Sequence, residues 1–234
     1  MSETRLRFRN RLLLNLSEGE LERLGDMEPI ELALRDRLET AGEPIRFVYF
    51  LESGLASVVG EVPGPGSIEV GMVGSEGMTG VAIVEHDVQS PFETFMQVPG
   101  AGHRIEAIRL AEVLRESPEI RRLFLLYARS FSIQLASTAM ANGKSKLEAR
   151  LARWLLMVAD RVGSRFNVTH EFLALMLAVR RSGVTLAMQL LEGKGLIRST
   201  RGTVAIVDRS GLIAHADGAY GLPEREYERL LGEN

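Results

Sequence analysis

Cysteine is absent from all 234 residues of the sequence. Its absence excludes disulfide bonds, zinc sites built from thiolates, cysteine-bound iron–sulfur clusters and a cysteine nucleophile. The four histidines lie in separate segments, and no G-x-S-x-G, P-loop or H-E-x-x-H pattern accompanies them. We therefore expect a protein that is not an enzyme, and we assign no catalytic residue, no metal site and no cofactor.

Long apolar runs are also lacking. No stretch of 18 apolar residues occurs, and the N-terminus begins with charged residues before a short apolar run. A membrane-spanning helix needs about 20 apolar residues, and a secretory signal needs an uninterrupted apolar core. The sequence therefore predicts a cytoplasmic protein without a membrane partner.

Charge is distributed unevenly along the chain. Residues 1–143 carry 14 Lys and Arg against 21 Asp and Glu, a net charge of −7, whereas residues 144–234 carry 14 against 10, a net charge of +4. Within residues 144–209 the count is 12 against 5, a net charge of +7. Such a basic module is suited to meet phosphates. Chance segregation of surface charges would produce the same pattern, so the charge alone does not decide.

The N-terminal half changes pattern near residue 28. Residues 10–25 place leucines on both sides of a Ser-Glu-Gly break, which predicts two short helical turns. Residues 28–107 consist of short apolar or alternating runs separated by glycine and proline, including Pro63 to Gly66. Strands broken by turn residues at this density predict a compact antiparallel barrel or roll.

A helical pattern follows. A short helix is predicted near 108–116, and Pro118 then opens a run whose apolar residues are spaced by threes and fours through Ala141. A stripe of about six turns is longer than one small roll can bury, so it favours pairing with the same helix of a second subunit. The alternative is a helix that lies across its own domain. Asn142 to Lys144 are expected to end this helix and form a hinge before a helix at 147–163.

Residues 167–208 carry the functional signal. Thr169 is predicted to cap a short helix, a turn is expected at Ala178-Val179, and a second helix is expected near 182–192. The predicted inner face of the second helix consists of Val184, Leu186 or Ala187, Leu190 and Leu191. Two β-prone runs then meet at Arg201-Gly202, which predicts a hairpin. The whole segment is typical of a winged helix-turn-helix.

In a helix-turn-helix, residues at the N-terminal end of the second helix reach base edges in the major groove. Helix N-termini and arginines elsewhere meet phosphates. The candidate base-reading residues are Arg181, Ser182 and Thr185, and the candidate phosphate contacts are Thr169, Arg180 and Arg201. A helical hairpin with a wing also serves protein–protein contact, so a scaffold module that does not bind DNA is the alternative function.

With these residues in view, the chain resembles the cyclic-AMP receptor protein/fumarate-nitrate regulator (CRP/FNR) superfamily. The segments that carry the resemblance are GEPIRFVYFLESGLASVV (42–59), EVGMVGSEGMTG (69–80), LARWLLMVADR (151–161) and THEFLALMLAVRRSGVTLAMQLLEGKGLI (169–197). The resemblance implies an α+β fold with four parts. These are a cyclic-nucleotide-binding-like, jelly-roll-type β-roll (1–116), a dimerisation helix (117–143), a winged helix-turn-helix (144–217) and a C-terminal tail (218–234).

The resemblance also implies a function: a homodimeric transcription regulator that binds a palindromic operator in double-stranded DNA, contacts RNA polymerase and responds to an effector in the roll. Many relatives have proline where Ser182 stands, and serine also begins helices. By similarity, the effector pocket is expected at Glu76, Gly77, Met78, Thr79 and Gly80.

Cyclic AMP is not expected to be the effector. The relatives that bind cyclic nucleotides grip the phosphate with an arginine after this segment, and here residues 81–97 contain none. The residues aligned with the adenine contacts, Leu135 and Ala136, have side chains that cannot form hydrogen bonds. Haem bound by His86 or His103 is an alternative to a plain surface role for these histidines. The effector stays unidentified.

Overall fold

The computed structural model describes residues 8–61 and 67–232. Within them the chain divides into two compact units. The described residues of the first unit are 8–58, 72–132 and 225–232, and those of the second are 59–61, 67–71 and 133–224. The four functional parts expected from the sequence, with boundaries after residues 116, 143 and 217, stay a prediction. The turn expected at Pro63 to Gly66 lies outside the described residues.

The first unit begins with two short helices, as predicted. They are α1 (Arg11–Leu14) and α2 (Glu18–Leu24), and all of their leucines except the half-buried Leu14 are buried. Asn10 caps α1 by accepting hydrogen bonds from the backbone N–H groups of Leu12 and Leu13. Ser17 and Glu20 form a reciprocal capping box at the start of α2, the arrangement that the Ser-x-x-Glu spacing favours.

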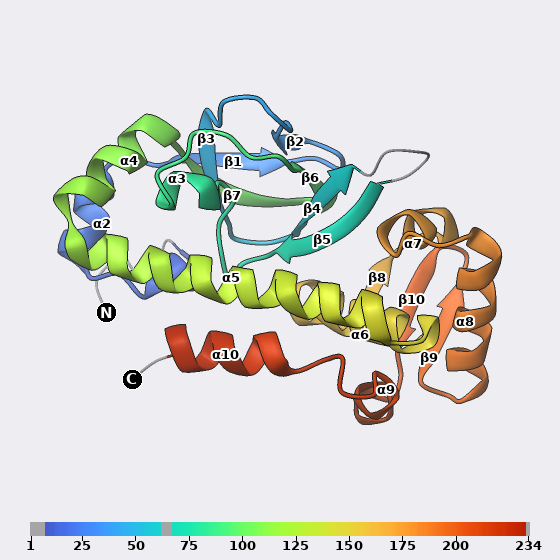
Figure 1. The fold of residues 1–234 in the computed structure, drawn as a ribbon. Coiled ribbons are helices and arrows are strands. Elements are labelled where there is room, and N and C mark those ends of the chain that lie inside the picture. The colour runs from blue at the N-terminus through green and yellow to red at the C-terminus, as the bar shows by residue number, and fades with distance from the viewer. Residues whose placement is uncertain (1–7, 62–66, 233–234) are drawn as a thin grey trace. The chain divides into compact units, whose positions relative to one another are not determined.

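The roll consists of two antiparallel sheets, as expected from the glycine-punctuated runs (Figure 1). One has the strand order β1-β7-β3, and the other has the order β2-β6-β4-β5. The strands are β1 (Glu28–Leu32), β2 (Arg37–Glu39), β3 (Phe47–Leu51), β4 (Leu55–Glu61), β5 (Ser67–Val73), β6 (Glu93–Val98) and β7 (Gly100–Glu106). A single turn of helix, α3 (Val81–Val84), connects β5 to β6. Strand β7 pairs antiparallel with both β1 and β3.

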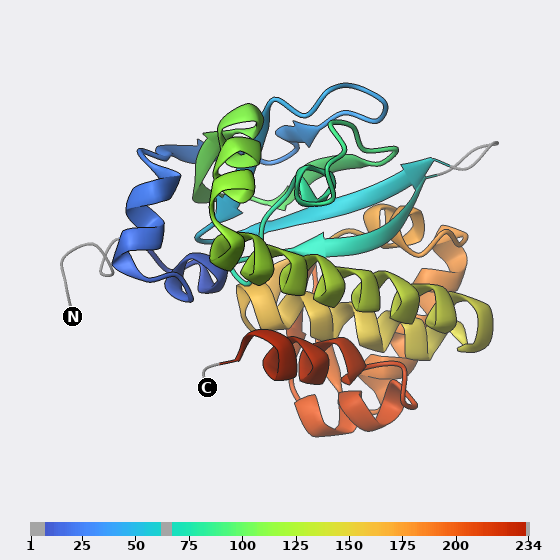
Figure 2. The same cartoon turned by 60° about the vertical axis from the view of Figure 1, so that its left-hand side comes forward.

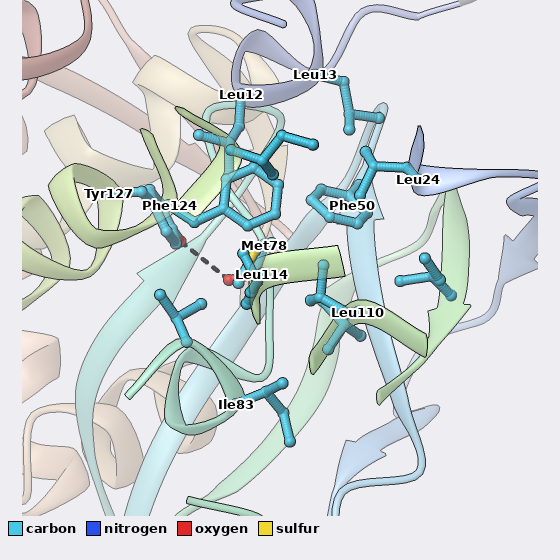
Figure 3. Close-up of a cluster of buried hydrophobic side chains, with 14 of the residues drawn as sticks. Leu12, Leu13, Leu24, Phe50, Met78, Ile83, Leu110, Leu114, Phe124 and Tyr127 are labelled. Atoms are coloured by element: carbon cyan, nitrogen blue, oxygen red, sulfur yellow. Dashed lines mark hydrogen bonds between the residues drawn. The ribbon is translucent and has the colours of Figure 1, made fainter. Parts of the chain in front are cut away.

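Helix α4 (Ala107–Glu116) closes the roll, and α5 (Pro118–Lys144) follows after Ser117. Figure 2 shows α4 standing across the beginning of α5. The core of this unit lies between the roll and these helices, where Phe50, Met78, Leu110 and Phe124 have no exposed surface (Figure 3). Burying side chains of this size contributes about 1.5–3 kcal/mol each.

The C-terminal tail forms helix α10 (Leu222–Leu231). Its last two turns belong to the first unit and complete that unit's core with Tyr227 and Leu231. Arg11 forms an ion pair with Glu228 at 2.7 Å, and the Asn15 side chain donates to the carbonyl of Leu231. The two ends of the described chain are therefore fastened to each other.

Helix α5 continues through Asn142 and Gly143 and ends at Lys144, so the break expected at 142–144 lies at Ser145 and Lys146 instead. The backbone N–H of Ser145 still donates to the carbonyl of Ala141 at 2.9 Å. Gly in a helix costs only about 1 kcal/mol relative to Ala, and Asn costs less. Continued backbone hydrogen bonding outweighs such a cost.

The second unit contains four further helices or helix segments around a small sheet of order β8-β10-β9. The elements are α6 (Leu147–Val162), β8 (Arg165–Asn167), α7 (His170–Met176), α8 (Arg181–Gly193), β9 (Ile197–Thr200), β10 (Thr203–Ile206) and α9 (Arg209–His215). Strand β8 and helix α9 were not predicted from the sequence. A sequence signal for α9 exists in Asp208, whose side chain caps the helix by accepting from the N–H of Gly211.

Candidate nucleic-acid interface

Helices α7 and α8 form the helix-turn-helix predicted from the sequence (Figure 1). Thr169 caps α7, with its hydroxyl accepting from the N–H of Phe172 at 3.2 Å. Between the helices, Ala178 adopts a left-handed conformation with φ 49°. The axis bends by 108° between α7 and α8, within the range of about 90–120° that this motif uses.

The buried face of α8 consists of Val184, Ala187, Met188 and Leu191, each at most 2% exposed. The sequence left Leu186 and Ala187 as alternatives for this face, and the structure selects Ala187. Leu186 is 58% exposed, and Leu190, which was expected inside, is 40% exposed. The prediction for Leu190 was wrong, because α8 needs only one narrow stripe to pack against α6 and α7.

Arg150 helps to hold the turn between the two helices. Its guanidinium donates to the carbonyl of Leu177 at the end of α7, and to the side chain of Asn142. Arg153, which is 6% exposed, donates to the hydroxyl of Thr138 at 3.1 Å. Burial lowers the pKa of both arginines. Their guanidinium groups bond to atoms of the same unit.

Trp154 fastens the β4–β5 hairpin within the same unit. Its indole Nε1–H donates to the Glu69 carboxylate at 2.7 Å, and both residues are at most 6% exposed. A cavity of about 20 Å³ lies beside them, room for about one water molecule. The indole is 3% exposed and belongs to the core of the unit.

The N-terminal end of α8 presents the candidate base-reading residues to solvent. Arg181 and Ser182 are exposed, and Thr185 is half-buried. The Arg181 guanidinium forms an ion pair with Glu171 of α7 at 2.8 Å, with both side chains about two thirds exposed. An exposed pair of this kind contributes about 0–1 kcal/mol, so Arg181 can exchange Glu171 for another acceptor at little cost.

The hydroxyl of Thr185 is already engaged. It donates to the carbonyl of Arg181 at 3.1 Å and lies 3.0 Å from Nδ1 of His170. Its remaining outward group is the methyl. Sequence reasoning missed Glu171 and His170 as neighbours of these residues, although both follow the predicted cap at Thr169 in the first turn of α7.

The candidate phosphate contacts lie at helix and hairpin ends. Thr169 and Arg180 are the N-cap residues of α7 and α8, and both are exposed. Arg201 and Gly202 form the predicted two-residue turn between β9 and β10, with φ values of 34° and 77°. Two positive φ angles in succession are the feature of a type I′ hairpin turn. This turn leaves Arg201 exposed at the tip of the wing.

The segment expected to line an effector pocket, Glu76 to Gly80, has its main chain bound by side chains of the first unit. The carbonyls of the first three residues accept, in order, from the Tyr227 hydroxyl at 2.7 Å, the Asn10 amide at 2.7 Å and the Tyr127 hydroxyl at 3.0 Å. Figure 3 shows the Tyr127 contact. None of the three donors was predicted from the sequence.

The rest of this segment is equally engaged. Thr79 exchanges hydrogen bonds with the main chain of Tyr49, and the N–H of Gly80 donates to Glu39 at 2.8 Å. Burial raises the pKa of the Glu39 carboxyl, and hydrogen bonds from Gly80 and Thr94 oppose that effect in part. A Cβ on Gly77 would lie 2.2 Å from the Tyr127 hydroxyl oxygen, so only glycine fits there.

Residues 8–61 and 67–232 contain no group of three or more His, Asp or Glu residues placed to hold a metal ion. His103 forms a contact of 3.2 Å with Glu52, and His86 is exposed. No single described helix is long and apolar enough to span a membrane; only the bent pair α7 and α8 passes by length and composition.

Comparison with known proteins agrees with this geometry. Residues 149–215 match the family model of the Crp-like helix-turn-helix domain. The chain has the fold of the CRP/FNR regulators and carries their helix-turn-helix domain. The matched range runs from α6 to α9, so it contains every candidate DNA contact named above. Among curated proteins, no sequence matches the chain significantly.

Three solved structures illustrate how far the CRP/FNR fold extends. The c-di-GMP responsive global regulator CLP of Xanthomonas campestris has a TM-score of 0.67 at 17% identity, covering 81% of this chain and 99% of its own. FixK2 of Bradyrhizobium japonicum has a TM-score of 0.70 at 12% identity, and the match covers 81% of this chain and 97% of FixK2. A CRP/FNR-family protein of Eubacterium rectale has a TM-score of 0.70 at 14% identity, and the match covers 88% of this chain and 98% of that protein. At these identities the likeness establishes the fold of the chain alone.

Proposed function

We propose that the chain is a homodimeric, DNA-binding transcription regulator whose helix α8 enters the major groove. One observation carries the proposal: α8 packs on α7 through one stripe and presents Arg181, Ser182 and Thr185 outward, in a region with a net charge of +7. Arginine pairs with guanine through two hydrogen bonds, and serine bonds to either type of base. Thr169, Arg180 and Arg201 then contact phosphates on either side and fix the orientation.

The second subunit pairs with the first through α5. This helix has 27 residues, about 40 Å at 1.5 Å per residue. The apolar stripe that the sequence predicted for this pairing begins with Ile120, Phe124 and Tyr127, which are buried in the core of the first unit. Pairing would therefore use another face of the helix, formed by exposed residues spaced by threes and fours: Leu125, Arg129, Ser132, Ala136 and Met140. Leu125 is 41% and Met140 66% exposed, and the small side chains of Ser132 and Ala136 allow close approach in that part of the helix. This spacing is typical of helices that pair along their length. A dimer of this kind carries two copies of α8, which suits a palindromic operator.

Control by an effector in the roll is part of the proposal, with residues 76–80 as the expected contact. Cyclic AMP in its usual pose is not proposed, since the arginine that would hold the phosphate is missing from residues 81–97. The carbonyls of this segment are hydrogen-bonded already. An effector would therefore have to replace those bonds or use other atoms. A cytoplasmic location and contact with RNA polymerase remain parts of the same proposal.

DNA binding is tested with a labelled duplex selected from a random library by the full chain. The dissociation constant should rise steeply with salt, because Lys and Arg displace counterions from phosphates. Arg181→Ala should weaken binding to the selected duplex by about 1–3 kcal/mol and to random duplex by little. Equal losses on both duplexes would make Arg181 a phosphate contact.

Arg37→Ala is the matched control for Arg181→Ala. Arg37 is an equally exposed arginine, at 67% against 66%, and it also forms an ion pair of 2.8 Å, with Glu93 in the roll. Its removal should leave DNA binding unchanged. A protein scaffold, the alternative function, would bind neither duplex with a measurable dependence on salt.

Dimerisation is tested by Ala136→Glu, which places two like charges against each other along α5. Light scattering should report a monomer, and specific DNA binding should be lost with it. Glu43→Gln, an exposed change in the roll, should leave the dimer intact. A wild-type chain that is monomeric at micromolar concentration would refute this part of the proposal.

A further inference from the structure

Beyond its first turn, the outward face of α8 carries two exposed leucines, with the exposed Gln189 between them. Leu186 is 58% exposed and Leu190 is 40% exposed, one turn apart on this face. The core does not need them, because Val184, Ala187 and Leu191 supply the buried stripe. Single exposed leucines are common on protein surfaces and carry no meaning. Here, however, the exposed leucine adjoins the candidate base-reading residues.

Leu186 follows Ser182 by four residues, so the two side chains lie on the same face of α8, about 6 Å apart along the axis. Thr185, the other outward residue at this level, has its hydroxyl engaged with Arg181 and His170 and offers its methyl. The second turn of α8 therefore presents carbon rather than hydrogen-bonding atoms. It continues directly from the polar first turn formed by Arg181 and Ser182.

A major groove offers one apolar group that distinguishes the base pairs, the C5-methyl of thymine. Leucine has no donor or acceptor and gains by removing such a methyl from water. We propose that Leu186 is a specificity-determining residue that reads a thymine methyl in each half-site, beside the base read by Arg181. This inference rests on the proposed function and names the base that the second turn of α8 selects.

DNA rather than a protein partner is the occupant that the surroundings favour. Leu186 is continuous with Arg181 and Ser182, and the region around it carries a net charge of +7. A protein partner reached through an apolar patch would not require this basic surface. Leu186 lies one turn after Ser182, in the N-terminal half of α8, and the N-terminal part of this helix is the part that reaches base edges.

The test uses the selected duplex with each thymine replaced in turn by deoxyuridine, which removes only the methyl. One such replacement, in a single half-site, should weaken binding of the wild-type chain about three- to fivefold, the size expected for one buried methyl. Leu186→Ala should weaken binding to the thymine duplex by a similar factor or more. Leu186→Ala should bind the duplex with deoxyuridine at that position as tightly as it binds the thymine duplex. The protein change and the DNA change are then coupled.

Ile213→Ala is the matched control, because Ile213 is an exposed apolar residue of α9, at 40%. It should bind as the wild type does and keep the deoxyuridine effect. Equal deoxyuridine effects in wild type and Leu186→Ala, or no effect at any thymine, would overturn the inference. Unchanged DNA affinity of Leu186→Ala would likewise overturn it and indicate a protein partner for this patch.

These outcomes are separate from failure of the proposed function. A wild-type chain without specific, salt-dependent DNA binding would refute the regulator itself. A wild-type chain that binds specifically, loses affinity on Arg181→Ala and ignores the thymine methyls would refute only the role of Leu186.

Discussion

The segment Glu76 to Gly80 and the first half of α8 are both candidate binding surfaces, and they differ in how their polar groups are used. In the segment Glu76 to Gly80, three consecutive carbonyls accept hydrogen bonds from side chains of three separate elements, and the ring of Tyr127 covers Gly77. The second has an arginine in a weak exposed ion pair and an exposed leucine. Satisfied, buried groups contribute to folding, whereas exposed groups are free to bind. Substitutions in the two regions should therefore change different quantities.

The largest effect on folding is expected for Gly77→Ala. The new methyl would have to displace the ring of Tyr127, because its Cβ would lie 2.2 Å from the hydroxyl oxygen. Overpacking of this kind costs about 2–3 kcal/mol in the free energy of unfolding, measured by denaturant titration. Gly19→Ala in α2 is the control, since nothing lies within 4 Å of its Cβ position. It should be neutral or stabilise by up to about 1 kcal/mol. If Gly77→Ala and Gly19→Ala changed the free energy of unfolding equally, the Tyr127 ring would not be packed against Gly77.

Tyr127→Phe should have a smaller effect of the same sign. It removes the donor to the carbonyl of Met78 and leaves the ring in place. A buried hydrogen bond with one partner removed costs about 1–2 kcal/mol. Tyr227→Phe removes the neighbouring donor to Glu76 and should lower stability to a similar or lesser extent. If Tyr127→Phe unfolds at the same denaturant concentration as the wild type, the segment does not depend on that bond.

Glu39→Gln should make the roll less sensitive to pH. Burial raises the pKa of Glu39 in the folded state, so the folded state favours the protonated form. Its contribution to stability is fully present below the unfolded pKa and is lost as pH rises through the folded pKa. The variant keeps an acceptor for Gly80 and should gain melting temperature over the wild type as pH rises from about 4.5 to 8. Glu43→Gln, an exposed change, should show no such trend. If the melting temperature of Glu39→Gln fell relative to the wild type as pH rises, the pKa of Glu39 would be lowered rather than raised by folding.

Arg181→Ala should have the smallest effect on folding and the opposite profile. Losing an exposed ion pair with Glu171 should change the free energy of unfolding by less than about 0.5 kcal/mol. Specific DNA binding should fall about tenfold or more in the same preparation. If Arg181→Ala lost much of its stability and kept its DNA affinity, the first half of α8 would contribute to folding rather than to binding, as residues 76–80 do.

The sequence predicted the elements whose signals are local. The cap at Thr169, the turn at Arg201-Gly202 and the period of α5 all appear as expected, because each depends on neighbouring residues. It did not distinguish Leu186 from Ala187, since helical spacing alone leaves the buried stripe uncertain by one residue. The three donors to residues 76–78 lie 49 to 151 residues away from their acceptors, and no local pattern reveals such contacts. The break at Asn142-Gly143 was misplaced because helix propensity is weak beside backbone hydrogen bonding.

Trp154 is the only tryptophan in the chain. Its indole is 3% exposed and bonded to a carboxylate on the β4–β5 hairpin. Intrinsic fluorescence therefore comes from one site with one defined environment. Any event that loosens the hairpin from α6 would admit water to the indole and shift its emission to longer wavelength. The protein thus contains its own optical probe, and candidate effectors can be screened by titration without attaching a dye.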